Sequence, residues 1–240
     1  MTSMTFQGRR ALVTGGGSGI GRATSALLRQ RGAEVTVLDV DIAAVPAGCD
    51  AIAVDGRDAA AVDAAVTSLG PLDIVVNAIG VEYVAATTET TADAWERVLQ
   101  TNLSTYHYVT SAALKQMNAG GAVVQVSSQL ALVGARRFAA YTAAKAGIVG
   151  YARSVALEVA PRGIRVNVVC PGAVDTPLLQ RQFAEGAGPQ GTLADLVAMH
   201  PLGRLGSAVE IAEPIVFLCS QAASFMTGSV LVVDGGYVAQ

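Results

Sequence analysis

Residues 10–21 read Arg-Ala-Leu-Val-Thr-Gly-Gly-Gly-Ser-Gly-Ile-Gly. A short apolar run leads directly into a glycine-rich loop, and a helical pattern follows from about Ile20 to Arg31, where Gly32 ends it. Glycine permits close approach of the backbone to a ligand, and the first amides and the dipole of a helix attract a pyrophosphate. The spacing is Thr-Gly-x-x-x-Gly-x-Gly, not the commoner Gly-x-Gly-x-x-Gly. An ordinary glycine-rich turn is the alternative, but the order strand, loop and helix favours a dinucleotide-binding βαβ unit.

The rest of the chain repeats this alternation. We expect strands at 34–38, 51–54, 72–76, 122–126, 164–169 and 230–233, and helices at about 58–68, 91–117, 141–159 and 207–220. Such alternation predicts an α/β fold with a doubly wound, parallel, seven-stranded sheet that is Rossmann-like and has helices on both faces. No linker or repeat interrupts the pattern, so residues 1–240 are expected to form a single NAD(P)-binding domain.

The composition narrows the classes of partner and location. The chain has 240 residues, of which 52% are hydrophobic and 15% charged, and its formal net charge is −3. With no basic run, nucleic acid is not an expected partner, and with no long apolar run or signal peptide, neither is a membrane. Cys49, Cys170 and Cys219 have neither metal-ligand spacing nor a disulfide framework, so we expect buried thiols, no metal site and a cytoplasmic location.

An acidic residue ends the second expected strand. Asp39 is placed to accept hydrogen bonds from the hydroxyls of an adenosine ribose, whereas a 2′-phosphate would meet its negative charge. The loop offers no Arg or Lys to hold such a phosphate, and Arg22 lies inside the helix. These features favour NAD over NADP. Asp41 is close enough to share the role, although it also suits a helix cap.

A second motif suggests chemistry. Tyr141 and Lys145 are four residues apart, so on a helix they share one face. An ammonium beside a phenol lowers the pKa of the phenol, which makes Tyr141 a candidate base. Ser128 follows an apolar strand, and its hydroxyl is therefore expected at the carboxyl edge where parallel sheets bind ligands. A solvated Tyr–Lys pair on a helix surface is the alternative.

Taken in order, these segments resemble the short-chain dehydrogenase/reductase family over essentially the whole chain. The matching pieces are Thr14–Gly21, Val54-Asp55, Asn77–Gly80, Asn102, Ser128, Tyr141-x-x-x-Lys145, Pro171–Thr176 and Thr227–Gly236. The resemblance implies a catalytic tetrad of Asn102, Ser128, Tyr141 and Lys145. In it Tyr141 is the acid/base, Ser128 binds the substrate oxygen, Lys145 binds the nicotinamide ribose, and Asn102 holds a water that relays protons. The alternative for Asn102 is an amide that satisfies helix backbone.

The resemblance also implies a set of cofactor-binding residues. Asp55 is assigned to the adenine amine, Asn77 and Gly80 to the cofactor cleft, and Val174 and Thr176 to the carboxamide. The full set is Gly15, Gly17, Ser18, Gly19, Ile20, Gly21, Asp39, Asp55, Gly56, Asn77, Ala78, Gly80, Tyr141, Lys145, Pro171, Gly172, Val174 and Thr176. Two positions depart from the family pattern: Asn77-Ala-Ile-Gly80 replaces Asn-Asn-Ala-Gly, and Gly56 replaces a β-branched residue that packs on adenine.

The substrate site is expected to be largely apolar. Ser128 and Tyr141 would orient the substrate, Leu130, Phe138 and Leu178 would contact it, and Val81, Tyr83 and Leu132 would add further walls. Residues at about 175–205 would form a lid, with a glycine-rich base at 185–191. A surface helix over a hydrophobic gap is the alternative. Arg136 and Arg137 are taken as a solvated loop in preference to a site for an acidic substrate.

The sequence thus predicts an NAD-dependent oxidoreductase that interconverts a secondary alcohol and a ketone. The alternatives are a reductase of a 3-oxoacyl thioester and a non-catalytic nucleotide-binding regulatory protein on the same fold. Enoyl reductases of this family set the Tyr six residues before the Lys, whereas here the spacing is four. The partners expected are a small-molecule alcohol or ketone and, from the resemblance, further copies of the chain in a homotetramer.

Overall fold

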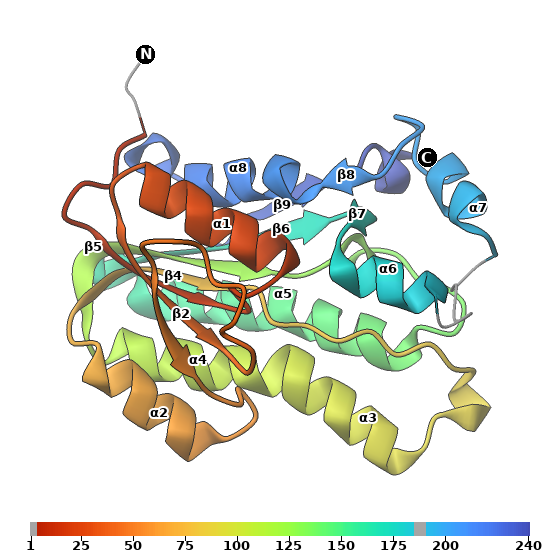
Figure 1. The fold of residues 1–240 in the computed structure, drawn as a ribbon, viewed down its shortest axis with the longest axis horizontal. Helices are drawn as coiled ribbons and strands as arrows, with labels where there is room; N and C mark the ends of the chain where they lie inside the picture. The colour runs from red at the N-terminus through yellow and green to blue at the C-terminus, as the bar shows by residue number, and fades with distance from the viewer. Residues whose placement is uncertain (1–3, 185–190) are drawn as a thin grey trace.

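The computed structural model describes residues 4–184 and 191–240 and is built around one parallel sheet (Figure 1). Seven strands lie in the order β3-β2-β1-β4-β5-β6-β9 and all pair in parallel. Their bounds are β1 Arg10–Thr14, β2 Glu34–Asp39, β3 Asp50–Ala53, β4 Leu72–Asn77, β5 Met117–Val126, β6 Arg165–Pro171 and β9 Val230–Val233. The sheet confirms the predicted doubly wound, Rossmann-like architecture.

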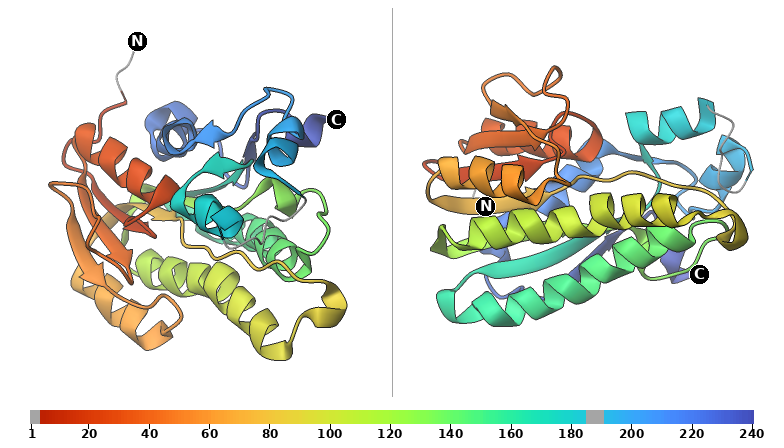
Figure 2. Two further views of the ribbon diagram at one scale, coloured as in Figure 1. Left: turned by 45° about the vertical axis from the view of Figure 1, so that its right-hand side comes forward. Right: turned by 90° about the horizontal axis from the view of Figure 1, so that it is seen from below.

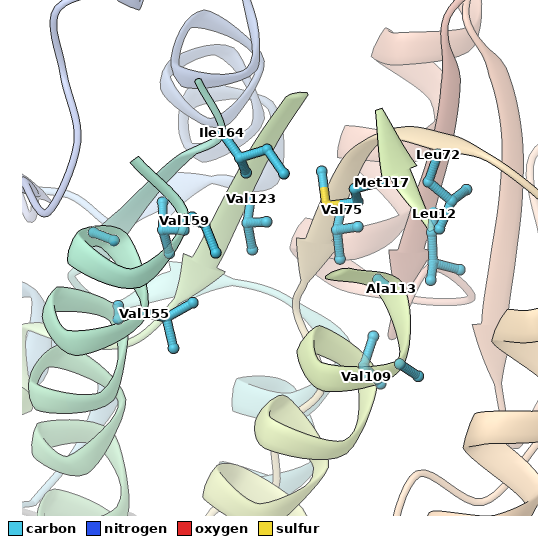
Figure 3. Close-up of a cluster of buried hydrophobic side chains, with 14 of the residues drawn as sticks. Leu12, Leu72, Val75, Val109, Ala113, Met117, Val123, Val155, Val159 and Ile164 are labelled. Carbon is cyan, nitrogen blue, oxygen red and sulfur yellow. The ribbon is translucent and has the colours of Figure 1, made fainter. Parts of the chain in front are cut away.

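Helices cover both faces of this sheet because successive strand residues point to opposite sides. On one face, α1 (Gly19–Gln30) and α8 (Ala208–Cys219) pack on a cluster that includes Val13 and Val76. On the other, α2 (Ala59–Ser68), α4 (Thr105–Leu114) and α5 (Ala139–Val159) pack on Leu12, Val75 and Val123 (Figure 3). Neighbours along a strand therefore belong to separate cores.

The sequence predicts one continuous helix at 91–117, and the structure shows that this prediction is wrong in two respects: the helix is interrupted, and it ends earlier. It consists of α3 (Ala92–Leu99), a π-helical turn at Gln100–Ser104, and α4, which ends at Leu114. Figure 2 shows α3 and α4 as a nearly continuous rod beside α5. Met117 already belongs to β5, because Gly120, with a φ of 77°, and Gly121 follow and disfavour helix.

The region after β6 contains two short helices, α6 (Pro177–Ala184) and α7 (Leu193–Ala198), in the segment expected to form a lid or a surface helix. It also contains a two-residue strand pair, β7 (Val174–Asp175) with β8 (Gly206–Ser207), which was not predicted. Strands this short carry no periodic signal. In contrast, the N-terminus of α8 was predicted correctly, since Ser207 and Glu210 form a reciprocal capping box. Of the three cysteines, Cys49 is only partly buried.

The register of the central strands brings the expected site residues together. Thr14 at the end of β1 pairs with Leu38 of β2 and with Asn77 of β4, and Asn77 pairs with Gln125 of β5. Strands β2 and β3 lie on one side of β1, and the strands from β4 onward lie on its other side. The crevice between β1 and β4 is therefore the topological switch point, where ligands bind in such folds. Among residues 4–184 and 191–240, no helix has the length and apolarity needed to span a bilayer.

Candidate functional site

Tyr141 and Lys145 lie one turn apart on α5, as predicted, and both are buried, with 8% and 3% of their surfaces exposed. The Lys145 Nζ lies 5.7 Å from the centroid of the Tyr141 ring and donates a hydrogen bond to the Val126 carbonyl at 3.1 Å. The Ser127 hydroxyl donates to the Lys145 carbonyl at 2.8 Å, which fastens α5 to the end of β5. A solvated pair on a helix surface is therefore the wrong interpretation.

Ser128 faces the same place from the end of β5. It is the N-cap of a short 3-10 turn at Gln129–Ala131, and its Oγ accepts a hydrogen bond from the Leu130 amide at 3.2 Å. Its hydroxyl lies near the Tyr141 phenol and lowers the pKa of that group. The structure thus brings Ser128, Tyr141 and Lys145 into one buried group.

The electrostatics of this group differ from the sequence-based expectation. Burial raises the pKa of Tyr141 well above its usual range, and the nearby Glu82 carboxylate raises it further. Burial lowers the pKa of Lys145 to about 8. The Lys145 ammonium does not counteract the effect of burial on the pKa of Tyr141, because it contacts the Val126 carbonyl and the Tyr106 hydroxyl instead. At neutral pH the chain alone keeps Tyr141 protonated and ready to donate a proton.

Asn102, the fourth predicted catalytic residue, lies in the π-helical turn and is fully buried. Its Oδ1 accepts from the Val81 amide at 3.0 Å, and its Nδ2 donates to the carbonyls of Val81 and Val98 at 2.9 and 3.1 Å. The side chain therefore satisfies backbone groups and fixes the loop after β4. A Cβ on Gly80 would lie 3.1 Å from Asn102 Oδ1 and 3.4 Å from Lys145 Nζ, so glycine keeps the space between them. The water-relay role of Asn102 stays a prediction.

The glycine loop has the close backbone contacts that its sequence predicts. Gly15 has a φ of 68°, and a Cβ there would lie 2.8 Å from the Ala78 carbonyl oxygen. A Cβ on Gly21 would collide with the carbonyl of Gly15, so α1 approaches the loop closely only because residue 21 is glycine. Ser18 is the N-cap of α1 but its side chain makes no capping bond. This cradle and the uncapped first turn fit the pyrophosphate of a dinucleotide.

Asp39 ends β2 beside this loop. Its Oδ2 accepts from the Gly17 amide at 2.9 Å and its Oδ1 accepts from the Asp41 amide at 3.2 Å. The carboxylate is thereby fixed at the expected ribose position, next to the phosphate loop. Arg22 donates to the Ala44 carbonyl at 2.8 Å and so is engaged elsewhere.

Three other predicted cofactor residues have unanticipated partners. Asp55 forms an ion pair with Arg57, with 2.6 Å between Oδ2 and Nη2, and both side chains are half-exposed. A Cβ on Gly56 would lie 2.6 Å from a methyl group of Thr105, which explains why a β-branched residue is missing there. The Asn77 side chain is fully buried and bonds Thr14, Thr110 and Gln125. It therefore ties strands together, and only its backbone is left for the cleft.

A cavity of about 130 Å³ adjoins Ser128 and Tyr141. Leu130, Phe138 and Leu178 line it, as predicted for substrate contacts, together with Pro171, Gly172, Val174 and Thr176 of the predicted cofactor set. This volume is below the ~300 Å³ typical of sites for drug-sized ligands, which favours a small substrate. Leu179 of α6, Leu196 of α7 and Met199, which directly follows α7, contribute to the walls; Figure 1 shows both helices at the same end of the molecule. Part of the expected lid, residues 185–190, lies outside the described residues.

Several expected walls are wrong. Val81, Tyr83 and Leu132 do not line the cavity, because Tyr83 packs on Val98, Ala140 and Ala144 while Val81 and Leu132 are exposed. The residue between the first two, Glu82, lines it instead. Arg136 and Arg137 are exposed and outside the cavity, as a solvated loop requires.

Four polar residues near the site were missed by sequence reasoning. Glu82, Gln129 and Gln182 line the cavity. Tyr106 places its hydroxyl 2.8 Å from both the Ile79 and Val126 carbonyls and 3.5 Å from Lys145 Nζ. Glu82 lies two residues after Gly80, a predicted cofactor-binding residue. This closeness in sequence was the one signal that could have placed Glu82 near the site.

No cluster of His, Cys, Asp and Glu that could hold a metal occurs in the part of the chain that the structure describes. His200 is buried and its Nε2 accepts from the Ala173 amide at 3.1 Å, while its Nδ1 lies 2.9 Å from the Leu196 carbonyl. Both ring nitrogens are thus used by the backbone, and His200 has a structural role.

Comparisons with known proteins agree with this geometry. A family model described as "Enoyl-(Acyl carrier protein) reductase" matches residues 15–238. The chain is 38% identical to cyclohexanol dehydrogenase from Acinetobacter sp. (strain SE19), over 99% of this chain and 98% of the relative. It is 43% identical to cis-4-hydroxycyclohexanecarboxylate dehydrogenase from Sinomonas cyclohexanicum, over 98% of each. A solved structure of a putative 2-deoxy-d-gluconate 3-dehydrogenase from Agrobacterium tumefaciens with bound NADP superposes with a TM-score of 0.89, at 32% identity and 100% coverage of both chains.

Proposed function

Because the chain belongs to the short-chain dehydrogenase/reductase family and is an oxidoreductase of secondary alcohols and ketones, we propose that it oxidises a small cyclic alcohol with NAD. The observation that carries this proposal is the buried group of Ser128, Tyr141 and Lys145 beside a small cavity. Two relatives that cover almost the whole chain are named for cyclohexane-ring alcohols, which supports this class of substrate.

In the proposed mechanism Tyr141 exchanges a proton with the substrate oxygen. The Ser128 hydroxyl, which lies near enough to Tyr141 to lower the pKa of the phenol, is proposed to bind the same oxygen and orient it. Lys145 contributes positive charge beneath the Tyr141 ring and is proposed to bind the nicotinamide ribose. Asn102 is proposed to hold a relay water while its amide fixes the loop at Val81. A bound nicotinamide supplies the hydride acceptor or donor.

The function is tested with a panel of cyclic and open-chain secondary alcohols and ketones, followed by the absorbance of NADH. We expect turnover of at least one cyclic secondary alcohol with NAD. Faster turnover of a 3-oxoacyl thioester than of any free alcohol or ketone would instead support the alternative. An enoyl reductase is disfavoured, since Tyr141 lies four residues before Lys145 and not six.

The proposed choice of NAD over NADP depends on Asp39, and we expect the Asp39→Ser variant to change it. Removing the carboxylate removes the repulsion of a 2′-phosphate, so the ratio of kcat/KM for NADP to that for NAD should rise by at least about tenfold. Asp41→Ser is the matched control, because that carboxylate accepts only from the Ala43 amide, two residues away. A preference for NADP in the unmodified enzyme would overturn this role of Asp39.

We also propose that the chain forms a homotetramer in the cytoplasm. Strand β9 is an edge strand of four apolar residues, all only partly buried, and Leu157 of α5 is 78% exposed. Both are surfaces that a partner copy would cover. Light scattering should give a mass about four times 24.4 kDa. A mass near that of one chain would refute the assembly.

A further inference from the structure

Glu82 is a partly buried residue at the catalytic cavity, its Oε2 is shielded from solvent, and the mechanism above does not use it. It lines the cavity together with Ser128 and Tyr141. Burial raises the pKa of Glu82 to about 6, against the opposing effect of the Lys145 ammonium. Taking a carboxylate out of water is costly unless hydrogen bonds compensate for it. A side chain kept in this position therefore needs an explanation.

The backbone beside Glu82 is held firmly. Both polar groups of the preceding residue, Val81, are bonded by the Asn102 side chain, which comes from the π-helical turn. The segment before it is confined as well, because a Cβ on Gly80 would lie within 3.4 Å of both Asn102 Oδ1 and Lys145 Nζ. A residue on a fixed backbone keeps its position when a ligand enters, as a recognition group must.

The contacts of Glu82 within the chain do not account for its burial. Its Oε2 has no hydrogen-bond partner among the described residues. The salt bridges of residues 4–184 and 191–240 do not include it, although Lys145 is near enough to affect its pKa. Lys145 itself donates to the Val126 carbonyl. Glu82 is therefore not held there by an ion pair.

Two buried amides share this property and line the same cavity. Gln129 and Gln182 are 6% and 8% exposed, and Gln129 Oε1 and Gln182 Nε2 lack partners among the described residues. Of the four buried side-chain atoms without a partner in that part of the chain, three belong to residues of this one cavity. Buried polar groups in native proteins are normally hydrogen-bonded, so such a concentration points to a polar ligand.

The residues around Glu82 indicate what kind of ligand this is. The described walls of the cavity contain Glu82 as their one charged residue, and the remainder includes Leu130, Phe138 and Leu179. A second carboxylate or a phosphate on the ligand would meet the like charge of Glu82, and none of the described wall residues is a cation that could offset it. A hydroxyl group is neutral, donates to a carboxylate, and can both donate to and accept from an amide.

We propose that Glu82 accepts a hydrogen bond from a second hydroxyl group of the substrate, so that the enzyme prefers diols or polyols to alcohols with one hydroxyl. This deepens the proposed function and rests on it, since Ser128 and Tyr141 must bind the reacting oxygen for Glu82 to reach another. Gln129 and Gln182 complete the polar part of the site. The largely apolar substrate expected from the sequence is replaced by one with a polar edge.

The test compares cyclohexanol with the isomers of 1,2-, 1,3- and 1,4-cyclohexanediol. With NAD, we expect kcat/KM of the wild type for at least one diol to exceed that for cyclohexanol by about tenfold or more, because a site built to bond a hydroxyl discriminates against its absence. Glu82→Met should lower this diol-to-cyclohexanol ratio by about 10- to 100-fold, the range for a lost hydrogen bond to a charged group. Glu82→Gln keeps a neutral acceptor and should lower the ratio less.

Two controls separate the possible outcomes. Glu96→Met removes an exposed carboxylate from α3 and should leave the ratio unchanged, and fluorescence of bound NADH checks that each variant has folded with an intact cofactor site. No turnover of any alcohol or ketone would overturn both the function and this inference. Two results for this ratio would overturn the inference alone, provided that cyclohexanol is turned over. One is a wild-type diol-to-cyclohexanol ratio of kcat/KM near one. The other is a ratio in Glu82→Met that stays within about twofold of the wild-type ratio. A faster rate with cis-4-hydroxycyclohexanecarboxylate than with any diol would also overturn it.

Discussion

The Tyr141→Phe variant is expected to lose at least about 10³-fold in kcat for alcohol oxidation while still binding NADH. General acid–base catalysis by one positioned side chain typically contributes ~10²–10⁴-fold, and the loss of a hydrogen bond to the substrate oxygen adds to it. The fold should survive, because Phe keeps the ring that packs edge-on against Phe138 at 5.9 Å between centroids. Steady-state rates and the NADH dissociation constant are the measurements.

The same prediction has a pH dependence. Because burial and the Glu82 carboxylate raise the pKa of Tyr141, the phenol is mostly protonated at neutral pH in the chain alone. Alcohol oxidation needs the deprotonated form as base, so kcat/KM of the wild type should rise with pH on the alkaline side. Carbonyl reduction uses the protonated form and should fall over the same range. The residual rate of the variant should show neither trend.

The matched control is Tyr151→Phe, which removes a hydroxyl from the same helix. Tyr151 packs against the core on the α2–α4–α5 side of the sheet and does not line the cavity. We expect its kcat to stay within about threefold of the wild type. If Tyr141→Phe turned over as fast as Tyr151→Phe, Tyr141 would not be the acid/base.

The apolar pattern sufficed for the central strands β1, β4 and β6 because they are buried on both faces of the sheet. Leu12 and Val13, or Val75 and Val76, point into different cores, so each strand is a continuous apolar run bounded by polar or glycine residues. The pairing of Tyr141 with Lys145 was equally predictable, since both lie on one helix and their spacing fixes their common face.

What the sequence did not reveal depends on contacts between distant segments. The π-helical turn at Gln100–Ser104 has helix-compatible residues and no local signal, yet it places Asn102 against Val81 and Thr105 against Gly56. Glu82 is one polar residue between two apolar ones, and alternation assigned the wrong members of that segment to the pocket. Only the fixed backbone after β4 decides which side chain enters the cavity.

The electrostatic expectation for Lys145 shows the same limit. Proximity in a helix implied that its ammonium would lower the pKa of Tyr141, but the sequence gives no measure of burial. In the fold both groups are desolvated, and the Lys145 Nζ points to the Val126 carbonyl and the Tyr106 hydroxyl. Spacing therefore predicted that Tyr141 and Lys145 share a face of α5, but it did not predict how burial shifts their pKa values.

Lys145→Met is expected to lower kcat by at least about 10²-fold and to weaken NAD binding, without destabilising the protein. The loss of positive charge near Tyr141 removes preorganised electrostatic stabilisation, for which such losses are typical. The expected stability follows from the direction of the pKa shift. Burial lowers the pKa of Lys145 to about 8, so between about pH 8 and its unfolded value of ~10.5 the folded chain binds fewer protons than the unfolded one.

Stability of the wild type therefore rises with pH across that window, and at pH 7 the buried ammonium opposes folding. Met removes this cost, and the Val126 carbonyl retains the Tyr106 hydroxyl as a partner at 2.8 Å. We expect the Tm of the Lys145→Met variant at pH 7 to equal or exceed that of the wild type. Lys115→Met, which removes an exposed ammonium paired with Asp63, is the control and should keep full activity. An active Lys145→Met enzyme would contradict a catalytic role for this charge. A variant that is inactive because it has unfolded would contradict the stability expected from the lowered pKa of Lys145.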